Sequence, residues 1–354
     1  MQSKKLNLTV VSASQGKFNN WTYEEFWYPL IVQMEKKGIN LNDNLSSAFI
    51  SINHNRKEYL NYRKKFPNNK KFLIRTEPIS VYPLQYEQKI EDLYDFILTP
   101  GGTFDLFKNF SYRNYPYFYV ENPFKYQAQN NNLSKMIKNR IEDKFYSKEK
   151  WDSRNILCSI VASNKISPLN DSNYELRRQV YDSLPDSKLS KFGQFWNFNL
   201  KDRVIIRLGM IKFSIKQRYG FNYFKTFNNF FLNLKQVNAI ENKHKTLINS
   251  KYHLIIENSH NFVTEKIFDS IIDGAIPIYI GTDLGELGIP IKSYIKCEAN
   301  INAINLLLSE LKNRNSNTYR EGALKFLSSG NLVKNFSGEE IYSQIIDEII
   351  NKLI

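Results

Sequence analysis

The stretch YHLIIENSHNFVTEKIFDSIIDGAIPIYIG, which runs from Tyr252 to Gly281, is the part of the sequence that decides the fold class. Its apolar run at 254–256 predicts a buried strand of a parallel sheet, and the polar group 257–259 ends that strand. A helix is expected over 264–273, and the apolar residues on its one face are Val263, Ile267, Phe268, Ile271 and Ile272. A second strand is expected over 275–281, so the stretch predicts a strand–loop–helix–strand unit of an α/β fold.

The start of the expected helix carries charges that suit an anion. Thr264, Glu265 and Lys266 lie in its first turn, where unpaired backbone N–H groups and the helix dipole favour negative charge. Lys266 would add a full positive charge there, and Glu265 is placed to hydrogen-bond the hydroxyls of a ribose. An ordinary amphipathic helix with a charged first turn has the same pattern, so these residues alone leave both readings open.

The same alternation of strands and helices extends over the whole chain. Between residues 1 and 100, strands are expected over 6–13, 48–53, 71–76 and 94–98, and helices over 22–38, 57–66 and 86–93. A polar, charged connection is expected over 125–153, followed by a strand over 155–162, a helix over 172–184, and late helices over 301–312 and 340–353. Such alternation predicts mostly parallel sheets with helices on their faces.

Composition limits the partners without choosing among them. The 354 residues carry a formal net charge of +14, which suggests nucleic acid, anionic lipid or a phosphorylated small molecule, although the lysine-rich composition of an AT-rich genome would also raise it. The two cysteines and four histidines form neither C-x-x-C nor H-E-x-x-H, so no zinc site is expected, and Cys158 is expected as a buried thiol. The sequence contains neither a signal-peptide pattern nor an apolar run of about 20 residues, which predicts a cytoplasmic protein, or one peripheral at the inner membrane face.

The order E-N-S, V-T-E-K and G-A-I-P-I-Y-I-G within 252–281 resembles the signature block of the bacterial-type α1,3-fucosyltransferases, which use GDP-fucose. The resemblance implies that Asn258, Phe262, Glu265 and Lys266 bind the donor, with Lys266 on its diphosphate. Phe262 stands where that family usually has tyrosine, so stacking could remain while a phenolic contact would be lost.

A second match lies in S-I-V-A-S-N, residues 159–164, and in the helix that follows it. By resemblance, Arg177 would be the second cation on the diphosphate, because it precedes Tyr181 by four residues as in the family, and a guanidinium offers paired donors to phosphate. Its neighbour Arg178 competes for this role, since only one of two adjacent helical side chains can point at the same ligand. A solvated helix charge remains the other reading of Arg177.

A third match, K-K-F-L-I-R-T-E-P, places Glu77 just beyond a strand end. The resemblance implies that Glu77 is the general base, which takes a proton from the acceptor hydroxyl as that oxygen attacks the anomeric carbon. A surface glutamate at a proline turn would look the same, and Glu121, in the similar string V-E-N-P, is the second candidate.

Together these matches, over roughly residues 70–325, predict a GT-B fold with two Rossmann-like domains facing across a cleft. The expected parts are an acceptor domain at 1–150, a GDP-sugar domain at 151–330 and a C-terminal helix at 331–354. The implied reaction is an inverting transfer of L-fucose from GDP-fucose to a hydroxyl of an N-acetylglucosamine- or glucose-containing glycan. Another GDP-sugar donor is the alternative, and a nucleic-acid-binding protein is a remote one, because no nucleic-acid-binding module is recognisable.

No cofactor is expected. The chain has no D-x-D motif, which many glycosyltransferases use to hold a metal ion, so a metal-independent enzyme is predicted. The basic, aromatic segment 201–236 has no recognisable counterpart in the family. It is hypothesised to touch an anionic membrane surface, where lipid-linked glycan acceptors reside, and an insertion packed on the donor domain is the alternative.

Overall fold

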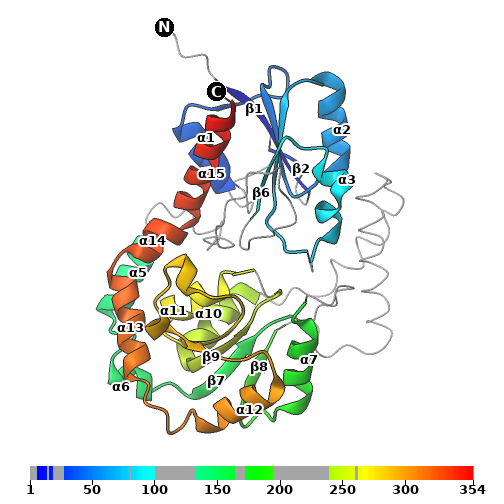
Figure 1. Ribbon diagram of the computed structural model, residues 1–354. Coiled ribbons are helices and arrows are strands. Elements are labelled where there is room, and N and C mark those ends of the chain that lie inside the picture. The colour runs from blue at the N-terminus through cyan, green and yellow to red at the C-terminus, as the bar shows by residue number, and fades with distance from the viewer. Residues whose placement is uncertain are drawn as a thin grey trace. The chain divides into compact units, whose positions relative to one another are not determined.

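The computed structural model describes residues 6–13, 16–18, 28–79, 81–99, 133–163, 172–193, 239–259 and 262–353. The described residues form two compact units, each built on its own sheet (Figure 1). The N-terminal unit contains the residues up to Leu133 and those from Val333 onward, and the C-terminal unit contains those between Ser134 and Leu332.

The sheet of the N-terminal unit has four parallel strands in chain order, which are β1 (Asn7–Ser12), β4 (Ala48–Ile52), β5 (Lys70–Ile74) and β6 (Phe96–Leu98) among the described residues. Two short strands pair with β1, namely the antiparallel β2 (Gly16–Lys17) and the parallel β3 (Asn40–Leu41). The helices are α1 (Tyr28–Lys36), α2 (Arg56–Lys65), a 3-10 turn (Pro83–Tyr86) and α3 (Gln88–Glu91). All four strands expected in this region are therefore confirmed, whereas the predicted helix start at Thr22 lies outside the described residues.

Alternating side chains of these strands enter two hydrophobic clusters, because successive strand residues point to opposite faces. Leu8 and Val10 face one cluster and Val11 faces the other. The first cluster is completed by α1 and by α15 (Gly338–Leu353), which lies beside α1 (Figure 1). The inward face of α15 consists of Ile341, Tyr342, Ile345, Ile346 and Ile349. Since each buried isoleucine contributes about 1.5–3 kcal/mol, the end of the chain is an integral part of the N-terminal unit.

The sheet of the C-terminal unit is parallel throughout its described strands. They are β7 (Ile156–Val161), β8 (Ser190–Phe192), β9 (Ser250–Ile256), β10 (Ile276–Ile280) and β11 (Ile295–Lys296). Their spatial order is β8, β7, β9, β10, β11, so the direction of winding reverses between β7 and β9. In doubly wound sheets, ligands bind beyond the carboxyl ends of the strands at such a switch point.

The helices of the C-terminal unit include two in the segment expected as a polar connection. These two are α5 (Leu133–Glu142), whose first residue falls in the N-terminal unit, and α6 (Lys148–Asp152). The other helices of the unit are α7 (Tyr174–Ser183), α10 (Ala239–Asn249), α11 (Lys266–Ile272), α12 (Ile301–Glu310) and α13 (Asn317–Ser328). Short 3-10 turns lie at Gly285–Leu287 and Ile291–Ser293, and α14 (Asn331–Phe336) leads into α15. The sequence did not predict α13 or α14 as helices.

Four predicted helix starts are wrong by two residues; the helices expected from 86 and 340 begin at Gln88 and Gly338. The helix expected from residue 172 begins at Tyr174, because Ser172 pairs as an isolated β-bridge with Ser259. The helix expected from residue 264 begins at Lys266, because Thr264 is held by Glu257 at the end of β9. Within the described ranges, no helix has the length and apolar character needed to cross a bilayer. The segment 201–236 lies outside those ranges.

Candidate functional site

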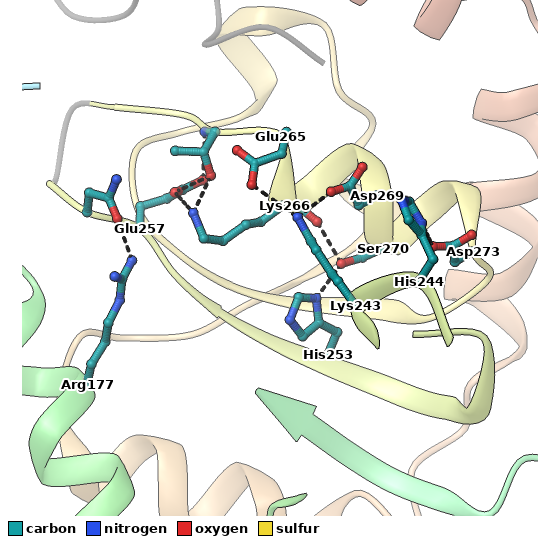
Figure 2. Close-up of polar contacts among 12 residues, drawn as sticks. Arg177, Lys243, His244, His253, Glu257, Glu265, Lys266, Asp269, Ser270 and Asp273 are labelled. Carbon is teal, nitrogen blue, oxygen red and sulfur yellow. Dashed lines mark hydrogen bonds and ion pairs between the residues drawn. The ribbon is translucent and has the colours of Figure 1, made fainter. Parts of the chain in front are cut away.

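The best-defined polar cluster lies at the carboxyl end of β9, beside the switch point between β7 and β9 (Figure 2). Arg177 reaches it from α7. Its Nε donates to the carbonyl oxygen of Ile256 at 3.0 Å, and its Nη2 donates to the same oxygen and, at 2.8 Å, to Oδ1 of Asn258. The side chain is only 2% exposed, so the guanidinium is held in one place. Arg177 and Asn258, both predicted from sequence, therefore meet across 81 positions of chain.

The choice between the two neighbouring arginines follows from their contacts. Arg178 pairs with Glu175, one turn earlier on the outer face of α7. Arg177 points instead to the strand end, and its Nη1 makes no hydrogen bond to any residue that the structure describes. Nη1 of Arg177 is thus available to a ligand beside the switch point, and the binding role of Arg177 stays a prediction.

A buried carboxylate organises the loop between β9 and α11. Glu257 accepts a hydrogen bond from the amide of Thr264 at 2.9 Å and another from its hydroxyl at 2.7 Å. Lys266 donates to the Thr264 hydroxyl at 2.8 Å, and its Nζ lies 3.7 Å from Glu257 Oε2. The Thr264 amide, expected to be open to an anion, is therefore already occupied, and Lys266 is the group that faces the strand end.

Burial lowers the pKa of the Lys266 ammonium, and the positive charge of Arg177 acts in the same direction. The carboxylates of Glu265 and Glu257 oppose this shift, and Glu257 Oε2 lies 3.7 Å from the ammonium.

Glu265 precedes α11 as its N-cap residue, and its Oε1 lies 3.0 Å from Nζ of Lys243 on α10. Lys243 also pairs with Asp269, one turn along α11 (Figure 2). Burial opposes the charge of Lys243, yet Asp269 and Glu265 outweigh it and raise its pKa. Sequence reasoning missed Lys243, because its surroundings, E-N-K-H-K-T, contain no motif that points to a site.

Phe262 and Asn258 differ in how open they are. The Phe262 ring is 4% exposed, so little of its surface is left for the stacking that the resemblance implies. Asn258 is half-buried, with its Oδ1 bonded to Arg177. Asn258 is thus the better placed of the two for a ligand at the strand end.

Glu77 belongs to the N-terminal unit, at the carboxyl end of β5. Its carbonyl oxygen accepts hydrogen bonds from Gln85 Nε2 at 3.1 Å and from the Tyr86 hydroxyl at 2.9 Å, and its side chain is half-buried. The guanidinium of Arg75, ion-paired with Glu91, lies 4.1 Å from the centre of the Tyr86 ring. The side chains of Gln85 and Tyr86 therefore hold the backbone of the loop that carries Glu77.

The second candidate base, Glu121, lies outside the described residues. Among the residues that the structure describes, no group of three or more His, Cys, Asp or Glu side chains is arranged to hold a metal ion.

Comparisons with known proteins agree with this architecture. No protein-family model and no curated protein matches the sequence. Three crystal structures of α1,3-fucosyltransferase, one without a stated ligand, one with GDP-fucose and one with GDP, align with 100% of this chain and 92% of theirs. Their sequence identities are 18%, 17% and 17%, and their TM-scores are 0.53, 0.51 and 0.52. The chain therefore has the α/β GT-B fold of these α1,3-fucosyltransferase structures.

Proposed function

We propose that this chain is a GT-B glycosyltransferase that takes its sugar from a nucleoside-diphosphate donor. One observation supports this most: Arg177 and Lys266, from separate elements, turn toward the same strand end at the switch point of a doubly wound sheet. The whole-chain likeness to structures that contain GDP and GDP-fucose supports the same class of ligand.

The proposed donor is GDP-fucose. Nη1 of Arg177 and the ammonium of Lys266 bind its diphosphate, Asn258 contributes its amide, and Glu265 binds ribose hydroxyls. Positive groups in this place stabilise the charge that develops on the departing GDP, which is the main electrostatic need of the reaction. In this proposal, Arg177 and Lys266 neutralise the diphosphate, as a metal ion does in other glycosyltransferases.

The proposed reaction is a single displacement with inversion. The carboxylate of Glu77 takes the proton of an acceptor hydroxyl, the hydroxyl oxygen forms the new bond to the anomeric carbon of fucose, and the bond from that carbon to GDP breaks. The acceptor is proposed to be an N-acetylglucosamine- or glucose-containing glycan. The fixed loop around Glu77 supports this role, because a general base must keep a defined position.

A panel of sugar nucleotides tests the proposal. Purified protein is incubated with GDP-fucose, GDP-mannose, UDP-glucose and UDP-N-acetylglucosamine, and release of nucleoside diphosphate is measured with and without glycan acceptors. Turnover of GDP-fucose above the others supports the proposal. Turnover of GDP-mannose alone would leave the class intact and replace the donor, and no turnover or binding of any sugar nucleotide would contradict it.

A further inference from the structure

Lys243 is a buried cation that no sequence motif singles out. Its side chain is 15% exposed, and its ammonium lies between two carboxylates of the α11 region, Glu265 and Asp269 (Figure 2). The two carboxylates differ, because the Asp269 side chain is 6% exposed and the Glu265 side chain 33%. Asp269 is thus an interior partner, whereas Glu265 lies at the border between protein and solvent.

The two oxygens of Glu265 also differ. Oε1 accepts from Lys243 at 3.0 Å, while Oε2 makes no hydrogen bond to another residue within the described ranges. The backbone N–H of Glu265 also bonds to its own carboxylate. With 33% of the side chain exposed, the carboxylate can still accept from the hydroxyls of a sugar, since each of its oxygens has two lone pairs. We propose that Lys243 is a positioning residue that fixes Glu265 so that Oε2 faces the ribose hydroxyls of the donor nucleotide. This inference rests on the proposed function.

The neighbouring charges explain why such a residue is needed. Lys266 follows Glu265 directly, and the two side chains attract each other. If Glu265 turned to Lys266, it would neutralise a cation that the diphosphate requires and lose its orientation toward the ribose. Lys243 draws Glu265 to the other side, toward α10, and so keeps both side chains available.

A simple clamp between α10 and α11 is the competing explanation. The ion pair of Lys243 with the interior Asp269 would be enough for such a clamp, because a buried pair of this kind is costly to break. The two roles differ in one measurable property: only a positioning role makes the preference for a ribose with hydroxyls depend on Lys243.

The test compares GDP with 2′,3′-dideoxy-GDP by isothermal titration calorimetry. The wild-type protein is expected to bind GDP roughly tenfold or more tightly, because a hydrogen bond to a charged group is lost in the analogue. Lys243→Met is expected to bring the two dissociation constants to within about twofold, and Lys243→Arg, which keeps the cation, to restore the preference. Asp269→Asn is the matched control, expected to lower the melting temperature while keeping the preference for GDP.

Each other outcome has a defined meaning. A Lys243→Met protein that folds and keeps the wild-type preference overturns the inference, as does a wild-type protein that binds GDP and its dideoxy analogue equally. Loss of the preference in Asp269→Asn as well as in Lys243→Met favours the clamp and also overturns it. A wild-type protein that binds neither nucleotide overturns the proposed function, and the inference with it.

Discussion

Nε of Arg177 lies 3.0 Å from the carbonyl oxygen of Ile256, so a helix side chain binds the last residue of the neighbouring strand β9. The same guanidinium bonds to Asn258 just beyond that strand. A planar group with several donors in a fixed fork can hold a strand end and still present Nη1 to a ligand in a defined direction. The contact therefore fixes the guanidinium at the switch point, where the donor diphosphate is proposed to bind.

Arg177→Lys is expected to weaken GDP binding about 10- to 100-fold, because the lost contacts are hydrogen bonds from a charged group. Titration calorimetry of GDP measures this. Arg178→Ala is the matched control, since Arg178 pairs with Glu175 on the exterior and its loss should change affinity less than about twofold. An equal effect of the two substitutions would remove Arg177 from the proposed site.

Lys266→Met is expected to lower GDP affinity by a similar factor of about 10–100, because it removes a partly buried cation that faces the strand end. The measurement is the dissociation constant of GDP at constant ionic strength. Lys296→Met, at an exposed position of β11, should leave that constant unchanged. GDP binding that is insensitive to Lys266→Met would contradict the assignment.

Transfer activity is expected to persist in EDTA. In the proposed site, Arg177 and Lys266 carry the charge that would otherwise be supplied by a metal ion. Initial rates are compared before and after dialysis against the chelator, and again after addition of Mn²⁺ or Mg²⁺. A rate that disappears with EDTA and returns with Mn²⁺ would show that the two side chains are insufficient.

Glu77→Gln is expected to lower kcat roughly 10²- to 10⁴-fold, because the amide keeps the size of the side chain but cannot accept the acceptor proton. GDP affinity and melting temperature should stay close to wild-type values, which marks an interaction made in the transition state. Glu121→Gln is the control and should cost little. If Glu121→Gln is inactive while Glu77→Gln retains activity, the role of base passes to Glu121.

The stability of the N-terminal unit is expected to fall on acidification because of His54. Burial, with a smaller effect from Arg56, lowers the pKa of His54 from 6.5 to about 4. Between these values the unfolded chain binds the proton and the folded chain does not, so stability present above pH 6.5 is lost as pH drops toward 4. At pH 5 this loss is about 2 kcal/mol.

Melting temperatures at pH 7 and pH 5 measure the effect of His54. His54→Gln should show a smaller difference between the two pH values than the wild type, because glutamine does not titrate. The same acid sensitivity in both proteins would show that His54 is not its cause.

The sequence alone was enough to predict the fold class. Strands are recognisable from short apolar runs such as 254–256, and helices from apolar residues three and four positions apart, because both patterns arise within a few residues of chain. Arg177, Asn258 and Lys266 were predicted as donor-binding residues; Arg177 bonds to Asn258, and Lys266 lies beside Glu257 at the end of the same strand. They were found through the family resemblance, and their role in donor binding stays a prediction.

Only the tertiary structure decided the remaining features. Lys243 carries no local signal, and its partners are the N-cap residue Glu265 and Asp269 of a different helix, α11. The helix predicted from Thr264 begins two residues later, at Lys266. Glu257, which follows β9, accepts the hydrogen bond of the Thr264 amide and so holds that residue outside the helix. The place of α15 beside α1 depends on apolar faces from opposite ends of the chain. The conformational preferences of neighbouring residues determine single helices, strands and turns. The features named here depend instead on ion pairs, hydrogen bonds and apolar contacts between residues far apart in sequence.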